Sequence, residues 1–489
     1  MKLSKSFIGL IIVSLVFYLY ATNSFSIFQS NSALEIVDFS IESSSNKIDI
    51  PSNPFRNPYY GDLHVHTKYS FDAYIFGVTA TPYDAYKFAT GQAIKHPLGF
   101  DMKLREPLDF YAVTDHGFYM GMIENYADTS SKMSKNEWTI PMHNLNRPEN
   151  VTVESTGERA DLFSSVVRQA IVIPHPWWHP NYIGAWLTNN IQLALKSFDY
   201  DVHKSAWADV ANAAEEFNDP GKFTTFIGYE FTTSTDVEGG NLHRNVIFNS
   251  SNAPIRPWTR IDSINPEDLW TWMDNLRDKG VDSLAMPHNS NGSNGQMFEV
   301  ETFRGNPINE EYAEKRMRNE PVVEMTQVKG TSDTHPLLSP DDEWADFEIM
   351  DKRVGSRPPT YSMPQGGYVR DAYLRGLTLD WEGRGNPYKF GLIGSSDTQT
   401  GAGAYDESNY WSKVGVLDGT DMGRGSVPLS QDRIDQLTQY SIDFNQPVST
   451  KQIEGKTYAD VGFDQWSASG LAVAWAEENT RDSIFPVSY

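Results

Sequence analysis

The amino-acid sequence predicts an α/β protein with a mostly parallel sheet, folded as one large domain. After residue 58, strand-like segments alternate with segments of helical periodicity, and this alternation is typical of the α/β class. Hydrophobic residues make up 39% and aromatic residues 13% of the 489 residues, which is enough apolar material for a large core. A single α/β barrel often uses more than about 250 residues, so the length does not require several domains.

Eight segments are strand-like, because they are short, apolar and bounded by polar or turn-forming residues. The predicted strands are Asp62–His66, Leu108–Thr114, Thr225–Thr232, Asn245–Phe248, Ser283–Met286, Val322–Thr326, Phe390–Gly394 and Leu471–Ala476.

Four segments carry helical signals. The segment Pro82–Gln92 begins with proline, which is favoured in the first turn of a helix. His203–Phe217 and Pro266–Lys279 each place their large apolar residues on one face, and Gly280 suits the C′ position of the second. Tyr368–Leu377 is the fourth predicted helix.

The first 30 residues resemble a targeting segment. Lys2 and Lys5 precede the apolar run Phe7–Ala21, which is shorter than the about 20 residues of a spanning helix. We expect a cleaved signal peptide, with an uncleaved inner-membrane anchor as the alternative. Either one implies export to the periplasm or the extracellular space.

Three further ranges complete the expected organisation. Residues 31–57 are rich in Ser, Asn and Pro and are expected to be a linker. Residues 58–489 are expected to form the folded domain. Within it, the polar and proline-rich region near residues 120–200, which contains Pro174–Pro180, is predicted to be a long insertion acting as a lid or binding loop.

Charge and cysteine content exclude several classes of protein. The formal net charge of −24 and the lack of a basic patch exclude nucleic acid as a partner, although such acidity can simply reflect solubility in a salty medium. The sequence has no cysteine, which excludes disulfides, a cysteine nucleophile, cysteine-ligated zinc and a lipoprotein anchor.

Polar residues capable of binding metal recur at the ends of the predicted strands. His64 and His66 project to the same face of one strand and can reach one ion, with Asp72 in the loop that follows. A lone His-x-His pair is common by chance, so the pair needs other support. Glu230, His288, His335 and Asp397 each end or follow another strand, as His116 does.

The histidines concentrate at these places. Five of the eleven histidines occupy strand ends, at positions 64, 66, 116, 288 and 335. Imidazole and carboxylate ligands without thiolate suit zinc, manganese or iron, and so many ligands require two or three divalent ions.

Three residues close in sequence to strand ends each have more than one possible role. Asp115 could orient an imidazole near the metals, or it could cap a helix. His243 and Arg244 begin a strand, and Arg244 could bind an anionic substrate group or pair with a neighbouring carboxylate. The sequence lacks the G-x-S-x-G motif and a P-loop, and no spacing singles out a carboxylate pair for glycoside cleavage.

Several motifs resemble a known superfamily. Gly61–Thr67, Ser70–Ala73 and Thr114–His116 resemble the PHP (polymerase and histidinol phosphatase) superfamily. Four longer segments resemble one branch of it, the DUF3604 family: Phe223–Glu230, Asn241–Phe248, Pro287–Asn291 and Phe390–Asp397. The resemblance covers roughly residues 58–480.

The resemblance implies a distorted (β/α)7 barrel with a trinuclear metal site. The first metal would be held by His64, His66, Glu230 and Asp397. Glu230 would bridge to a second metal held with His288 and His335, and Asp72 and His116 would hold the third.

The sequence departs from the PHP pattern in two ways. The last PHP motif usually reads Asp-x-His, whereas this chain has Asp397-Thr398-Gln399, and a glutamine is a weak ligand for the third metal. Chains of the family also usually continue beyond the position of Tyr489, which suggests a truncated C-terminal region.

These observations predict a metal-dependent hydrolase acting on a phosphoester or related ester. The resemblance implies that a hydroxide bridging two metals would be the nucleophile, and the substrate would be a small molecule or an oligomer. The alternative is a non-catalytic, metal-containing binding module of the cell envelope.

Overall fold

The computed structural model describes residues 33–41, 50–171, 198–235, 239–353, 360–444, 450–460, 466 and 469–485. The expected targeting segment and Pro174–Pro180 lie outside these ranges. Within them, no helix combines the length and the apolar character needed to cross a membrane.

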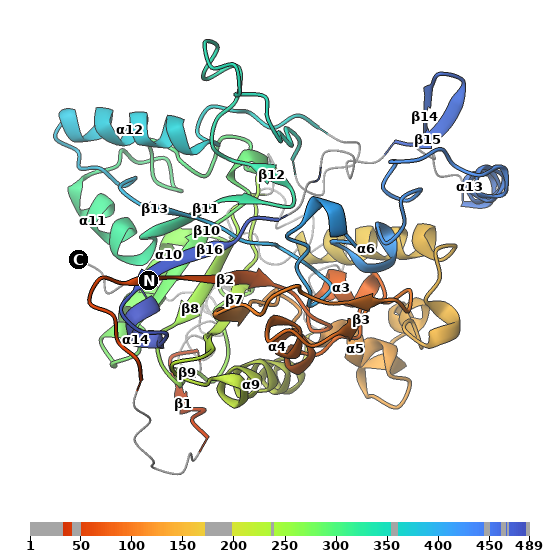
Figure 1. Ribbon diagram of the computed structural model, residues 1–489, viewed down its shortest axis with the longest axis horizontal. Helices are drawn as coiled ribbons and strands as arrows, with labels where there is room; N and C mark the ends of the chain where they lie inside the picture. Colours follow the sequence, from red (N-terminus) through yellow and green to blue (C-terminus); the bar gives the residue numbers. More distant parts are fainter. Residues whose placement is uncertain are drawn as a thin grey trace, which may run out of the picture.

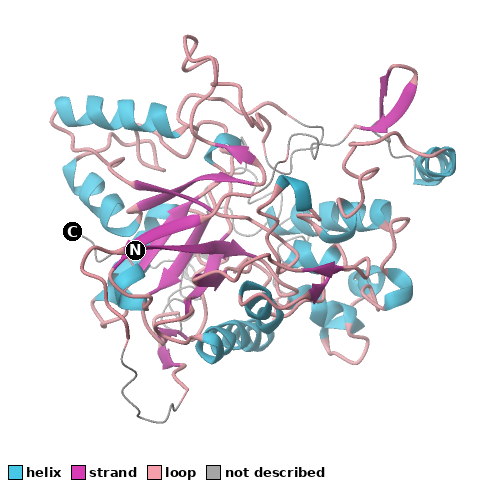
Figure 2. Ribbon diagram, viewed as in Figure 1, coloured by secondary structure: helices cyan, strands magenta, loops and turns pink. Residues whose placement is uncertain are grey.

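The predicted α/β class is confirmed, since strands occupy the centre of the molecule and helices pack outside them (Figure 2). One sheet has the order β16-β2-β5-β6. Strand β2 (Asn57–Val65) is parallel to β5 (Phe110–Val113), which is parallel to β6 (Thr224–Thr225). Strand β16 (Ala472–Ala476) runs antiparallel to β2.

Two further sheets carry the other strand ends of interest. Strands β7 (Ile227–Phe231), β8 (Arg244–Phe248) and β10 (Ser283–Pro287) form an antiparallel sheet with β8 in the middle. Strand β11 (Val322–Gln327) lies between β12 (Gly330–Thr331) and β13 (Gly391–Gly394), and it is parallel only to β13.

The expectation of a mostly parallel sheet is wrong for β8. Strand β8 follows β7 without an intervening helix, and antiparallel neighbours need no crossover connection. The hydrogen-bonded ladders of the described strands form separate sheets rather than a closed barrel, so the expected (β/α)7 barrel is not confirmed. Two isolated parallel bridges, Val65 with Thr398 and His116 with Glu230, link the sheets at the strand ends.

Helices lie around the strands (Figure 1), and they bury apolar residues such as Trp207 and Trp272. Helix α4 (Pro82–Ala89) begins with a capping box between Thr81 and Asp84 and packs on β5. Helix α9 (Tyr200–Phe217) packs on α4 and β7, and α10 (Pro266–Arg277) and α11 (Glu310–Asn319) pack beside β10. The remaining helices are α3 (Phe71–Ile75), α5 (Met122–Ala127), α6 (Thr156–Ile171), α12 (Val369–Trp381), α13 (Gln431–Phe444) and α14 (Arg481–Ile484).

Three small strand pairs lie at the periphery. They are β1 (Ile36–Asp38) with β9 (Asn252–Pro254), β3 (Ile94–Lys95) with β4 (Asp101–Met102), and the hairpin of β14 (Thr450–Ile453) and β15 (Lys456–Ala459). Part of the expected linker is therefore folded, because β1 completes a sheet and the carbonyl oxygen of Ala33 accepts a hydrogen bond from Trp272 Nε1 at 2.9 Å.

The described part of the insertion packs against the loop that follows β2. In this cluster the ring of Phe163 on α6 stacks on Phe71 with a centroid separation of 6.0 Å. The ring of Phe71 in turn lies 4.9 Å from the imidazole of His116. The insertion therefore borders the strand ends where the histidines meet.

Candidate metal centre

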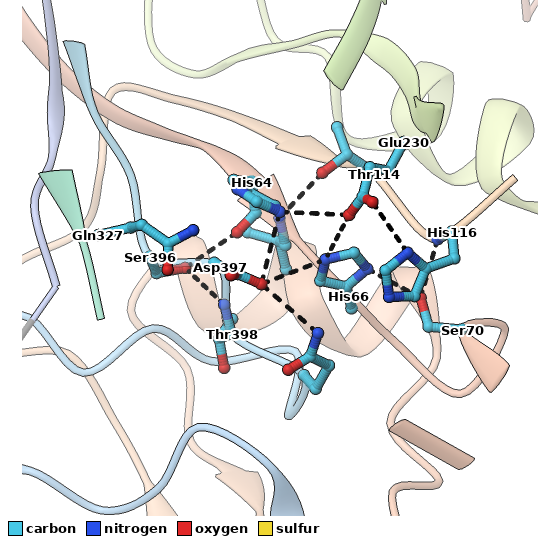
Figure 3. A network of polar contacts seen from close by, with 12 residues as sticks. His64, His66, Ser70, Thr114, His116, Glu230, Gln327, Ser396, Asp397 and Thr398 are labelled. Carbon is cyan, nitrogen blue, oxygen red and sulfur yellow. Dashed lines mark hydrogen bonds and ion pairs between the residues drawn. The ribbon is translucent and has the colours of Figure 1, made fainter. Parts of the chain in front are cut away.

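The ends of five strands bring histidine and carboxylate side chains into one buried cluster (Figure 3). His64 lies in β2 and Glu230 lies in β7. His66 and His288 directly follow β2 and β10, and His116 and Asp397 lie a short distance beyond β5 and β13. The members are His64, His66, His116, Glu230, His288 and Asp397, none of which is more than 5% exposed.

Glu230 occupies the middle of the cluster. Its Oε2 atom lies 3.4 Å from His64 Nε2, 3.3 Å from His66 Nε2 and 3.7 Å from His288 Nε2. Two ligands about 2.1 Å from a tetrahedral ion lie about 3.4 Å apart. The spacing around Oε2 is therefore that of ligands sharing an ion.

The second oxygen of Glu230 has different partners. Oε1 lies 3.1 Å from His116 Nδ1 and 2.6 Å from His243 Nδ1, and it accepts a hydrogen bond from Thr232 Oγ1 at 2.9 Å. One carboxylate thus contacts five imidazoles. Such a carboxylate is suited to bridging two ions.

Within the described part of the chain, four groups of three residues have ligand atoms close enough to hold an ion. They are His64–His66–Asp397, His64–His288–Glu324, His66–His116–Glu230 and Glu230–His243–His288. The groups share members, so the cluster has more ligands than one ion uses.

The imidazoles have the unsatisfied nitrogens that a metal would complete. Among the described residues, Nε2 of His64, Nε2 of His66 and both ring nitrogens of His288 are buried without a hydrogen-bond partner. Buried polar atoms are normally hydrogen-bonded, and leaving one unsatisfied costs about 1–3 kcal/mol. Divalent ions therefore fit the residues present.

The charges around the two carboxylates of the cluster, Glu230 and Asp397, favour their ionised form. Burial raises the pKa of Glu230, but the imidazoles of His116 and His243 hold this pKa well below its usual value. Burial likewise lowers the pKa of His64, yet the carboxylates of Glu324 and Asp397 raise it to about 10. Against its burial, the nearby carboxylates likewise raise the pKa of His116 to about 10, whereas burial and the charge of His64 hold the pKa of His288 well below its usual value. A divalent ion would compete with protons for the nitrogens of His64 and His116.

Glu324, which the sequence analysis missed, orients His64. Its Oε2 atom accepts a hydrogen bond from His64 Nδ1 at 2.8 Å, leaving Nε2 directed at Glu230. A carboxylate partner on the second ring nitrogen is the usual support of a metal-binding histidine. The sequence did carry a signal, since Glu324 is an acidic residue inside an apolar strand.

Asp115 supports the cluster indirectly. Its buried carboxylate accepts hydrogen bonds from Thr67 N and Oγ1, both at 2.6 Å, and from Ser70 Oγ at 2.7 Å. Ser70 Oγ also lies 2.9 Å from His66 Nδ1. Asp115 therefore positions His66 through Ser70, and it does not cap a helix.

Two residues proposed as ligands have different surroundings. Asp72 Oδ2 lies 3.3 Å from His116 Nε2, so it adjoins the cluster. His335 belongs to none of the four groups found among the described residues. Its Nδ1 accepts a hydrogen bond from Leu337 N at 3.1 Å, and its ring lies beside Tyr368.

His243 and Arg244 point in different directions. The His243 imidazole contacts Glu230 and is 18% exposed, the highest value among the imidazoles around Glu230. Arg244 is buried and its Nε donates to Glu320 Oε1 at 2.7 Å. The ion-pair interpretation of Arg244 is therefore the one that the structure favours.

Two lysines near Asp397 were also missed. Lys413 Nζ lies 3.0 Å from Asp397 Oδ1, and Lys329 Nζ contacts Asp397 Oδ2. Burial lowers the pKa of Lys413 to about 8, although Asp397 opposes this shift. Neither lysine lies in a recognisable motif, so the sequence carried no local signal for them.

Comparison with known proteins identifies the family only. The model of the family described as "Protein of unknown function (DUF3604)" matches residues 53–487. No curated protein and no solved structure matches the chain. The sequence resemblance to this family is confirmed, and the chain belongs to the DUF3604 family.

Proposed function

We propose that this protein is a metal-dependent hydrolase of a phosphoester or related ester, with two or more divalent ions around Glu230. The observation that carries the proposal is the position of Glu230 Oε2, which lies 3.3–3.7 Å from the Nε2 atoms of three buried histidines. Zinc, manganese and iron are the ions that such ligands favour.

The likeness to the PHP superfamily belongs to the same proposal. Strands β2, β5, β7, β8, β10, β11 and β13 follow one another as spatial neighbours. Strand β13 lies beside β16, which pairs with β2. The segment after β13 also pairs with β2 directly, through the bridge between Thr398 and Val65. This order of neighbours supports a distorted seven-stranded barrel whose strand ends carry the cluster.

In the proposed hydrolysis, the residues around the metal ions would have separate roles. When bound, divalent ions supply a stronger nucleophile at neutral pH and stabilise negative charge in the transition state. Glu324 and Ser70 fix the ring orientations of His64 and His66. His243 is exposed enough to meet a substrate, and Lys329, which is 11% exposed, would attract its anionic oxygens.

A non-catalytic, metal-containing binding module is the second candidate. It is favoured by burial, since the side chains of His64, His66 and Glu230 are at most 1% exposed. A metal enclosed in this way would stabilise the fold without meeting a substrate. Export to the periplasm or cell surface, based on residues 1–30, fits either function and remains a proposal.

A panel of chromogenic phosphate, sulfate and carboxylate esters tests the proposal on protein loaded with zinc, manganese or iron. We expect turnover of an anionic ester that is lost in His288→Ala and kept in His335→Ala, because only His288 belongs to the cluster. Bound metal without turnover of any ester would favour the binding module. Turnover that survives His288→Ala would place the reaction elsewhere.

A further inference from the structure

Lys413 is a buried cation built into the wall of the centre. Its side chain is 3% exposed, and its Nζ atom contacts Asp397 Oδ1 at 3.0 Å and Gln399 Oε1. The carbonyl oxygen of Lys413 also accepts a hydrogen bond from Gln399 N at 2.8 Å. Backbone and side chain of Lys413 therefore both bind the Asp397–Gln399 segment.

The loop that carries Lys413 is anchored by Asp418. The carboxylate of Asp418 accepts hydrogen bonds from Lys413 N, Val414 N and Ser412 Oγ, each at 2.8 Å. Asp418 is fully buried. Its contacts fix the backbone on both sides of Lys413, so the ammonium is held in place by the fold and not merely by attraction to Asp397.

The two central carboxylates share the imidazoles of His64 and His66 but differ in their other partners. Glu230 faces imidazoles, which can exchange a proton for a metal ion. Asp397 faces an ammonium on each oxygen, Lys413 on Oδ1 and Lys329 on Oδ2. Its Oδ1 also lies 3.5 Å from His64 Nε2 and 3.6 Å from His66 Nε2, at the edge that it shares with Glu230. The Lys413 ammonium thus contacts one carboxylate and one carboxamide, and the charge of Asp72 acts on it without a direct contact.

We propose that the Lys413 ammonium is the resident cation on the Asp72–Asp397 side of the centre, so that metal ions occupy only the Glu230 side. This inference rests on the proposed function, because it assumes that the Glu230 side binds metal. An ammonium ion repels a divalent ion placed beside it, and Lys413 already contacts two oxygen atoms that such an ion would need, Asp397 Oδ1 and Gln399 Oε1. Two ions per chain, and not three, are therefore expected.

An ammonium group in place of a third metal ion changes the chemistry of this side of the centre. An ammonium donates hydrogen bonds and attracts anions, but it does not convert water into a strong nucleophile as a divalent ion does. On this side of the centre Lys329, which is 11% exposed, would bind an anionic oxygen of the substrate, while the nucleophile is generated on the Glu230 side. This division points to a substrate with a negatively charged group next to the ester.

Anomalous diffraction from crystals of the metal-loaded wild-type chain tests the inference directly. We expect peaks beside Glu230 and none within coordination distance of Gln399 Oε1, with Lys413 Nζ retained there. A third peak bonded to Gln399 Oε1 would overturn the inference and leave the proposed function intact. Absence of every peak after loading with zinc, manganese and iron would contradict both.

A double variant gives the complementary test by metal analysis in solution. Gln399→His with Lys413→Ala removes the ammonium and supplies an imidazole, so we expect about one additional metal equivalent per chain. The matched control is Lys68→Ala, because Lys68 pairs with Glu124 and does not contact the cluster. An unchanged metal content in a folded double variant would contradict the inference, and the wild-type diffraction result decides if that variant does not fold.

Discussion

At the scale of single residues, the partner of each ionisable side chain decides its role. Glu230 and Asp397 are both buried carboxylates at strand ends, but among the described residues the first contacts five imidazoles and no ammonium, whereas the second contacts two ammonium groups and two imidazoles. In the sequence both are acidic residues at the end of a predicted strand, and only the folded structure shows that their partners differ. The side chains best suited to bind metal are therefore identified by their partners in the structure and not by their spacing in the sequence.

Glu324→Gln tests the support of the metal ligands. The substitution keeps the size of the side chain and removes the negative charge that holds His64 Nδ1 at 2.8 Å. Loss of a charged partner of a metal-binding histidine typically weakens metal affinity by about 10- to 100-fold. Competition titration against a chromogenic chelator would measure the change. An affinity equal to that of the exposed control Glu382→Gln would show that Glu324 does not support the site.

The sequence identified the cluster only in part, for reasons that are visible at this scale. His64, His66 and His116 lie in short sequence motifs, and the carboxyl ends of neighbouring parallel strands lie at the same edge of the sheet in an α/β fold. Glu324 and Lys413 reach the cluster through pairing of distant segments, which no local pattern encodes. His335 follows a strand as the others do, but its loop carries it to Tyr368 instead.

At the scale of elements, the pairing of β2 with β5 places His64 and His116 on adjacent strands. Gly61 of β2 lies opposite Phe110 of β5 in this parallel ladder. A Cβ atom at Gly61 would lie 2.4 Å from the Phe110 carbonyl oxygen and 2.3 Å from its ring. Only glycine allows this close approach of the two strands.

Gly61→Ala is therefore expected to destabilise the fold by about 1–3 kcal/mol, the usual cost of overpacking, and to weaken metal binding by shifting β2. Gly391→Ala is the matched control, since Gly391 also lies in a parallel strand and its nearest contact would be 3.9 Å away. Chemical denaturation of both variants measures the difference. Equal stabilities would mean that the β2–β5 contact tolerates a side chain.

The elements themselves were largely predictable, and their directions were not. All eight predicted strands and all four predicted helices are present, with ends displaced by a few residues. A buried strand has the same apolar composition whether its neighbour is parallel or antiparallel, so the antiparallel β8 could not be recognised. The strand β1 was missed because three residues carry too little periodicity.

At the scale of the whole molecule, buried neutral histidines away from the cluster tie stability to pH. Burial lowers the pKa of His203 to about 4 and that of His96 to about 3, below the value of 6.5 for an unfolded chain. Below pH 6.5 the unfolded chain therefore binds protons that the folded chain excludes. The free energy of unfolding should fall between pH 6.5 and about 4, by about 1.4 kcal/mol per pH unit for each histidine.

His203→Gln removes one of these two contributions. The variant should lose less stability than the wild-type chain when the pH is lowered from 7 to 5, in urea denaturation with chelator present. The comparison between the two proteins cancels the contribution of the carboxylates. Equal losses would mean that His203 is protonated in the folded protein, contrary to its burial beside the Gly117 carbonyl.

The central claim, that Glu230 joins divalent ions to a buried histidine cluster, is tested most directly by metal analysis of the purified chain and of Glu230→Gln. Gln keeps the size of the side chain but removes the charge that lies among five imidazoles. After loading and removal of free metal, the wild-type chain should hold about two equivalents, and folded Glu230→Gln should lose at least one. Equal metal content in the two proteins, or none in the wild-type chain, would contradict the account.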